Sequence, residues 1–371
     1  MTDNQKLKRI IARFNLDTPA GEIRPLGEGL INDTYFAEPG YVLQRINHHV
    51  FRNVENLQRN IELVTAHIRR KLTETGAEDI DRRVLRFRTA DNGKTFIEED
   101  GSYWRVSDFI RQSETRSEVT PESARQAGEA FGNFQAMLTD LPETLAETIP
   151  DFHNMELRLR QLREAVKADA AGRLAEVSGL VAEIEKLADE MCLAERLHRE
   201  GKLPKRVCHC DTKVSNMLFD PSGEPLCVID LDTVMPSFVF SDFGDFMRTA
   251  ANTAPEDEPD LDKIGFDMEI FKAFAQGYIS ATRNFLTPVE RDHLPYAVTL
   301  FPYMQAVRFL TDYLNGDTYY KTAYPEHNLV RARAQWRYFE LTREALPAMR
   351  SFITSLCSGR DSDCGQVRPA E

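Results

Sequence analysis

The apolar pattern changes near Pro121, and this change limits the folds that the chain can adopt. Before it, Asp91-Asn92-Gly93 is typical of a tight turn between strands, because Asn-Gly favours positive φ. Extended runs are expected at 41–46, 84–89, 94–98 and 103–106. One helix is expected over 53–71, and helical spacing predominates from Pro121 onward. The pattern predicts an α+β fold with a small β-rich lobe and a larger, mostly helical lobe.

The helical part predicts the domain boundaries. Apolar residues recur at helical spacing within the charged segment 156–199, which predicts a long helical stretch there. Further helices are expected over 266–285, 295–315 and 329–349, with one non-helical segment at 206–235. We expect a nucleotide-binding lobe over 1–110, a catalytic and substrate lobe over 111–357, and a flexible tail over 358–371.

The charge balance argues against some partners. Lys and Arg total 46 against 59 Asp and Glu, so the net charge is −13. We therefore expect no general binding to nucleic acid or to anionic membranes. No uncharged apolar run approaches the roughly 18 residues of a membrane span, and residues 1–14 lack the apolar core of a signal peptide. We expect a cytoplasmic monomer.

The cysteines do not form an obvious framework. Six are present, at irregular spacings, which fits a reducing compartment better than a disulfide-rich protein. Cys208-His209-Cys210 suggests a metal ligand set, but zinc sites usually add a second ligand pair, which is missing here.

The segment 206–235 carries the clearest chemistry. His209, Asp211 and Asn216 form the frame H-x-D-x-x-x-x-N, and Asp230 follows fourteen residues later after an apolar run. Phosphoryl transfer needs a carboxylate to accept a hydroxyl proton, which suits Asp211. It also needs hard oxygen ligands for Mg²⁺, which suits Asn216 and Asp230. The alternative is an ordinary polar hairpin, and the complete spacing favours a phosphotransferase.

This frame resembles the aminoglycoside phosphotransferase and choline kinase superfamily, whose fold is protein-kinase-like. Longer stretches resemble its bacterial N-acetylhexosamine 1-kinases: GEGLIN (27–32), NIELVT (60–65), HCDTKVSN (209–216), VIDLDTVMP (228–236), FSDFGD (240–245), RFLTDYLNGD (308–317) and YPEHNLVRARAQ (324–335). The similarity extends from about residue 20 to about residue 345. It implies a kinase that uses ATP and Mg²⁺.

The resemblance implies that the first lobe binds ATP. Gly27 and Gly29 lie where the family's phosphate-covering loop belongs, although the third glycine of the kinase pattern is missing. Asn32 and Thr34 occupy the same region and could donate hydrogen bonds to phosphate oxygens.

The strand that carries the family's phosphate-pairing Lys departs from the pattern. Gln44 stands at that position, and Arg45 should point to the other face of the strand. Glu62 is then the expected helix partner, hydrogen-bonded to Gln44. The resembled sugar kinases also carry Gln there, so the missing Lys does not imply inactivity.

Two further segments invite a functional interpretation. FSDFGD contains Asp-Phe-Gly, but the superfamily's metal-binding Asp ends the VID strand. Asp242 and Asp245 are therefore expected to brace the catalytic loop and to begin the next helix. Residues 255–262 are acidic and are expected to form a solvated loop; the alternative is a substrate lid.

The resemblance implies transfer of the γ-phosphoryl group of ATP to the anomeric C1 hydroxyl of N-acetylglucosamine or N-acetylgalactosamine. Asp211 would orient and deprotonate this hydroxyl, and Lys213 would stabilise the charge of the moving phosphoryl group. Asp232 would face the acceptor. The further candidate sugar-binding residues are Arg308, Asp312, Tyr313, Asp317 and Tyr324.

Alternatives stay open at this point. Arg308 and Asp312 are i,i+4 neighbours and could form an exposed ion pair with no role in binding. The acceptor could instead be choline, homoserine or an aminoglycoside. The chain could also be a non-catalytic nucleotide-binding scaffold, because it lacks the usual Lys.

Overall fold

The computed structural model describes residues 3–27 and 31–358, which divide into two compact units. The first unit comprises Met1–Ser117, Met137–Pro150 and Ser215–Pro236, and the second comprises Glu118–Ala136, Asp151–Val214 and Ser237–Glu371. The predicted boundary between residues 110 and 111 divides the chain once, whereas each of these units consists of three separate segments of the chain. Residues 359–371 of the predicted tail lie outside the described residues.

A small antiparallel sheet organises the first unit, as the α+β prediction requires. Its strand order is β1-β2-β3-β5-β4. The strands are β1 (Ile23–Pro25), β2 (Asp33–Ala37), β3 (Tyr41–Ile46), β4 (Phe96–Glu99) and β5 (Ser102–Asp108). The predicted strand over 84–89 is wrong. This segment makes an isolated bridge from Phe87 to Ser107, because β4 already pairs with β5 over residues 102–105.

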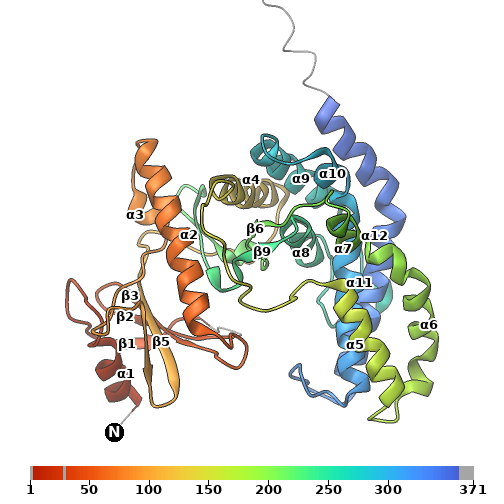
Figure 1. Cartoon of the computed structure of the whole chain (residues 1–371), viewed down its shortest axis with the longest axis horizontal. Coiled ribbons are helices and arrows are strands. Elements are labelled where there is room, and N and C mark those ends of the chain that lie inside the picture. Colours follow the sequence, from red (N-terminus) through yellow and green to blue (C-terminus); the bar gives the residue numbers. More distant parts are fainter. Residues whose placement is uncertain (1–2, 28–30, 359–371) are drawn as a thin grey trace, which may run out of the picture. The chain divides into compact units, whose positions relative to one another are not determined.

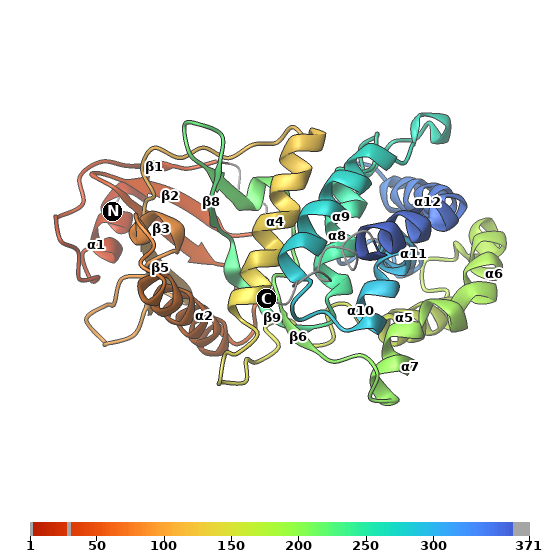
Figure 2. The same ribbon diagram turned by 90° about the horizontal axis from the view of Figure 1, so that it is seen from above.

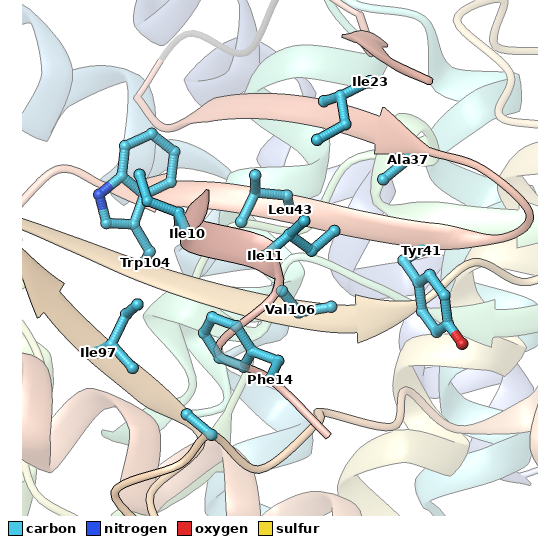
Figure 3. Packing of buried hydrophobic residues seen from close by; sticks show 11 residues of the cluster. Ile10, Ile11, Phe14, Ile23, Ala37, Tyr41, Leu43, Ile97, Trp104 and Val106 are labelled. Atoms are coloured by element: carbon cyan, nitrogen blue, oxygen red, sulfur yellow. The ribbon is translucent and has the colours of Figure 1, made fainter. Parts of the chain in front are cut away.

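The two faces of this sheet have different partners. The first-unit helices are α1 (Asp3–Ile11), α2 (Val54–Glu74) and α3 (Ile80–Arg83). Alternation along the strands sends Leu43 and Val106 to one face, where they belong to an apolar cluster with Phe14 (Figure 3). Gln44 and Arg105 point to the opposite face, where α2 lies alongside the sheet (Figure 1).

The second unit is mostly helical, as predicted. Its helices are α4 (Pro121–Met137), α5 (Met155–Ala168), α6 (Leu174–Met191), α7 (Leu193–Arg199), α8 (Phe240–Ala250), α9 (Met268–Thr282), α10 (Pro288–Asp292), α11 (Leu294–Leu314) and α12 (His327–Ser358). In Figures 1 and 2, α11 lies beside α12. None of the described helices is both long and apolar enough to cross a membrane.

The helical prediction over 156–199 is confirmed, but the segment divides into three helices because the backbone breaks twice. Asp169 ends α5 with φ of 39°, and Gly172 follows with φ of 68°. Left-handed backbone of this kind ends a helix. A second break at Cys192 separates α6 from α7.

A close helix contact fixes the position of α8. A Cβ atom added at Gly244 would lie 2.6 Å from the backbone oxygen of Ala297 on α11. No side chain larger than hydrogen fits at this distance without a shift of backbone. Since α8 carries Asp242 and Asp245, this contact holds the helix whose Asp242 binds the loop before Asp211.

Candidate active site

Asp211 follows a loop whose backbone is held by a buried carboxylate. Strand β6 (Arg206–Cys208) leads into His209 and Cys210. Asp242 on α8 accepts the backbone N–H of Cys210 at 2.7 Å and that of His209 at 3.0 Å. Cys210 has φ of 63°, a conformation that costs energy for a residue with a side chain. The contact confirms that Asp242 braces this loop.

Further buried hydrogen bonds hold Asp242 itself. Gln135 on α4 donates from Nε2 to Asp242 at 2.6 Å and accepts from the Tyr278 hydroxyl at 2.6 Å. The Thr212 hydroxyl donates to the backbone oxygen of Asp242 at 2.7 Å. Burial raises the pKa of the Asp242 carboxyl, while the donors from His209, Cys210 and Gln135 oppose this rise. Asp242 is thus bound to the chain both before Asp211, at His209 and Cys210, and after it, at Thr212.

Asp211 belongs to a group of alternating charges, here called the Asp211 cluster: Asp211, Lys213, Asp245 and Arg248. The Lys213 ammonium lies 2.6 Å from Asp211 Oδ1, and Arg248 lies 3.1 Å from Asp245 Oδ1. Burial alone would lower the pKa of Lys213, but Asp211 and Asp245 outweigh burial and raise it. Lys213 therefore stays charged beside the carboxylate.

The acidic segment 255–262 was expected to be a solvated loop, but two of its carboxylates form ion pairs with other parts of the second unit. Glu256 pairs with Arg248 of the Asp211 cluster at 2.6 Å. Asp257 pairs with His327 at the start of α12 at 2.9 Å. Helical or strand spacing does not reveal these pairs, because Arg248 is eight residues from Glu256 across a loop and His327 is seventy residues from Asp257.

Arg308 lies among aromatic side chains and another arginine. Its guanidinium carbon is 5.7 Å from the centre of the Phe152 ring and 5.6 Å from that of Tyr320. It donates to Gln305, a neutral acceptor, at 3.2 Å. Burial, followed by the charge of Arg308, lowers the pKa of Arg158 to about 10. The alternative of an exposed Arg308–Asp312 pair is wrong, because Asp312 is buried and has other partners.

Asp312 organises the loop after α11. Its carboxylate accepts the backbone N–H groups of Thr318, Tyr319 and Tyr320 at 2.9, 2.8 and 3.0 Å. It also accepts a hydrogen bond from Asn328 at 2.8 Å. These bonds fix the loop that places Tyr320 against Arg308, so Asp312 organises the surroundings of Arg308 through this loop.

The remaining candidate sugar-binding residues have partners on α6, directly before it, or at the start of α12. The Tyr313 hydroxyl donates to Glu176 at 2.9 Å. Asp317 pairs with Arg173 at 2.6 Å. Tyr324 is 41% exposed and stacks on His327. Their roles in substrate binding stay predictions.

In the first unit, a buried arginine connects three of the residues predicted to bind ATP, namely Asn32, Thr34 and Gln44. Arg105 on β5 donates from Nε to Gln44 at 2.9 Å and from Nη1 to Asp232 at 2.6 Å. Asn32 donates to the other carboxylate oxygen of Asp232 at 2.7 Å, and Gln44 donates to Thr34 at 3.2 Å. The Arg105 network comprises these five residues and Gln58 of α2, which accepts from Arg105 at 3.1 Å.

Two predicted residues compare with this network as follows: Asp232, expected to face the acceptor, belongs to it, and Glu62, expected to bind Gln44, does not. Both carboxylate oxygens of Asp232 are bound, by Arg105 and Asn32, and the residue is 2% exposed. Glu62 is exposed and accepts from the Thr95 hydroxyl at 2.5 Å, so its expected bond to Gln44 is wrong. Gln58, one helical turn earlier on α2, is the residue that reaches the network.

The predicted metal ligands lie on adjacent segments of the first unit. Asn216 precedes β7 (Met217–Phe219), and Asp230 follows β8 (Pro225–Val228), which pairs with β7. The Ile229 N–H donates to the backbone oxygen of Asn216 at 2.9 Å. Asp230 is exposed and has φ of 59°. An amide oxygen and a carboxylate on joined segments fit the hard ligands that Mg²⁺ prefers.

The predicted phosphate-covering loop is partly described. Gly27 has φ of 70°, and no described atom lies within 4 Å of the position that a Cβ would take, so a turn is the reason for glycine here. The Leu26 N–H donates to the backbone oxygen of Thr34 at 2.9 Å, which joins β1 to β2. Gly29 lies outside the described residues.

Comparisons with known proteins agree with this arrangement. Residues 22–283 match the family described as the phosphotransferase enzyme family. An aminoglycoside phosphotransferase from Alicyclobacillus acidocaldarius has 13% identity and a TM-score of 0.60, with 94% of this chain and 96% of that chain covered. A choline/ethanolamine kinase family protein from Mesorhizobium loti has 16% identity and a TM-score of 0.53, with 91% and 92% covered.

A third similar structure is the choline kinase LicA from Streptococcus pneumoniae, with 13% identity, a TM-score of 0.52, and 86% and 94% covered. At these identities the structures show a shared fold. The match over residues 22–283 covers most of the chain. This chain therefore belongs to the phosphotransferase enzyme family, with the fold of the aminoglycoside phosphotransferases and choline kinases.

Proposed function

We propose that this phosphotransferase transfers the γ-phosphoryl group of ATP to the anomeric C1 hydroxyl of an N-acetylhexosamine, either N-acetylglucosamine or N-acetylgalactosamine. The products are the sugar 1-phosphate and ADP. The braced loop before Asp211 supports phosphoryl transfer to a hydroxyl. The choice of a sugar rests on the resemblance in sequence and on the charges of Arg158 and Arg308.

Asp211 is the proposed base. Its carboxylate accepts the proton of the sugar hydroxyl while the hydroxyl oxygen bonds to the γ-phosphorus and the bond to the β–γ bridging oxygen breaks. An anomeric hydroxyl is more acidic than an ordinary alcohol, which eases this step. Lys213, 2.6 Å from Asp211, is placed to balance negative charge on the transferred group.

The first unit supplies the proposed nucleotide contacts. Asn32, Thr34 and Gln44 are the proposed donors to phosphate oxygens. Asn216 and Asp230 would hold Mg²⁺, which when bound neutralises charge on the triphosphate.

The observation that carries the acceptor class is a pair of arginines, Arg158 and Arg308, whose charges both act on the buried His153 beside α8. His153 contacts Ser241 of α8 at 3.0 Å, and burial lowers its pKa well below the usual value. The charges of Arg308, Arg158 and Arg248 lower it further. Arg158 and Arg308 donate to neutral acceptors, namely amide side chains and backbone carbonyls. Such an environment disfavours a cation such as choline and suits a neutral sugar.

An acceptor panel tests this proposal. ADP release is measured with ATP and Mg²⁺ in the presence of N-acetylglucosamine, N-acetylgalactosamine, choline, homoserine or an aminoglycoside. We expect turnover with an N-acetylhexosamine and none with choline or the aminoglycoside. The methyl glycoside of N-acetylglucosamine is the matched control, because its C1 oxygen carries no proton; it should give no ADP.

Each other result selects an alternative. Turnover with choline, homoserine or an aminoglycoside alone would replace the sugar proposal by that activity. Turnover with the methyl glycoside would move the reaction to another hydroxyl. ATP binding without turnover on any acceptor would support a non-catalytic scaffold.

A further inference from the structure

Arg105 is a buried cation at the position of the sheet where the lysine is missing. It is 2% exposed and lies directly across from Gln44 in the β3–β5 register. In the pattern of the wider superfamily, a lysine stands at the position of Gln44 and provides the positive charge for the nucleotide phosphates. Here the charge stands one strand away, on the same face of the sheet.

The residues proposed to bind phosphate are connected to this arginine. Thr34, Gln44 and Arg105 form one row across β2, β3 and β5. Hydrogen bonds run along the row, from Gln44 to Thr34 and from Arg105 to Gln44. Asn32 is connected through Asp232, to which both Asn32 and Arg105 donate.

The guanidinium has donors to spare. Its hydrogen bonds to described residues use Nε, toward Gln44, and Nη1, toward Asp232 and Gln58. Arginine carries five N–H groups, two of them on Nη2. The three partners hold the plane of the guanidinium in place, which favours directional binding of a phosphate oxygen.

We propose that Arg105 is the phosphate-binding cation of the nucleotide site and takes over the task of the missing lysine, with Nη2 donating to a phosphate oxygen of ATP or ADP. This inference rests on the proposed kinase function. The competing role is purely structural, in which Arg105 only neutralises the buried carboxylate of Asp232.

The test compares two ligands that differ in their phosphates. Dissociation constants for ADP and for adenosine are measured by calorimetry on the wild type and on Arg105→Gln. A phosphate contact predicts a loss of roughly 10–100-fold for ADP, with adenosine changed less than about threefold. Arg88→Gln is the matched control, because Arg88 is also buried and ion-paired in the first unit, with Asp17 and Asp108. It should leave the ADP-to-adenosine ratio unchanged.

A charge relocation separates the two roles further. The double variant Gln44→Lys/Arg105→Gln restores a cation one strand away, beside the same partners. We expect it to regain most of the lost preference for ADP over adenosine. Equal losses for ADP and adenosine in Arg105→Gln, or no regain in a folded double variant, would overturn the inference in favour of the structural role.

One measurement needs no variant. A crystal structure of the wild type with ADP should show Arg105 Nη2 about 3 Å from a phosphate oxygen. Phosphates bound elsewhere, with Arg105 directed only at its present partners, would contradict the inference and leave the kinase proposal intact. Failure of the wild type to bind ADP at all would contradict the kinase proposal itself.

Discussion

The side-chain carboxylate of Asp242 accepts a 2.7 Å hydrogen bond from the backbone N–H of Cys210, the residue before Asp211. This bond stabilises a left-handed conformation at Cys210 that a residue with a side chain rarely adopts. The strained backbone is thus held by a helix of the same unit. The conformation of Cys210 sets the direction of the backbone at the next residue, Asp211, which is the proposed base.

Replacing Asp242 by Ala should damage both stability and turnover. The variant leaves two backbone N–H groups and the Gln135 amide without their buried acceptor. We expect the free energy of unfolding in urea to fall by about 3 kcal/mol. Turnover should fall by about 100-fold, with the affinity for ADP nearly unchanged. Asp189→Ala, at a side chain that is 99% exposed, is the control; a loss below 1 kcal/mol in Asp242→Ala would contradict the bracing role.

The contact at Gly244 predicts a second stability effect. Gly244→Ala places a Cβ 2.6 Å from the Ala297 oxygen, so α8 must move or the variant must unfold more easily. We expect a loss of about 2–3 kcal/mol in urea unfolding. Gly179→Ala in α6 is the matched control, since no described atom lies within 4 Å of its added Cβ. It should be neutral or slightly stabilising, and equal stabilities of the two variants would refute the close contact.

His153 should contribute a measurable pH dependence of stability. Its folded pKa is lowered, mainly by burial, below the unfolded value of about 6.5. As pH falls below that value, the unfolded chain binds a proton that the folded protein does not bind. The free energy of unfolding should therefore fall by up to about 1.4 kcal/mol per pH unit from this residue.

His153→Gln should remove this part of the slope between pH 6.5 and 5. Ala175→Gln, at an exposed position of α6 that carries no titratable group, is the control and should leave the slope unchanged. Identical slopes in wild type and His153→Gln would show that His153 titrates normally.

Asp312 should control the loop that follows α11. In Asp312→Ala the N–H groups of Thr318, Tyr319 and Tyr320 lose their shared acceptor. Hydrogen exchange at these three amides should become at least about tenfold faster, and KM for the sugar should rise more than kcat falls. Glu326→Ala, exposed at the end of the same loop, is the control. Unchanged exchange in Asp312→Ala would contradict the organising role.

The sequence was sufficient for the features whose signal is local. The strand 41–46 and the helix near 53–71 lie close to their predicted places, because spacing along the chain determines them. The bracing by Asp242 was also predictable, because the family resemblance assigns the metal role to the Asp that ends the VID strand and leaves Asp242 for support. The assignment of catalytic and metal roles to Asp211, Asn216 and Asp230 stays a proposal.

Features that depend on distant partners could not be predicted in the same way. Arg105 matters because the register places it opposite Gln44, although a charged residue between Trp104 and Val106 was a usable signal. Helical spacing made Arg308 and Asp312 neighbours, but the chain folds back so that Asp312 binds the loop backbone instead. These outcomes depend on tertiary contacts that periodicity does not encode.

The most direct test of the central claim is the effect of Asp211→Asn on phosphoryl transfer. The variant keeps the shape of the side chain but removes the base that accepts the hydroxyl proton. We expect kcat with the preferred N-acetylhexosamine to fall by about 10³-fold or more, with the dissociation constant for ADP within about threefold of the wild-type value. Retention of more than a tenth of the wild-type kcat would contradict the account.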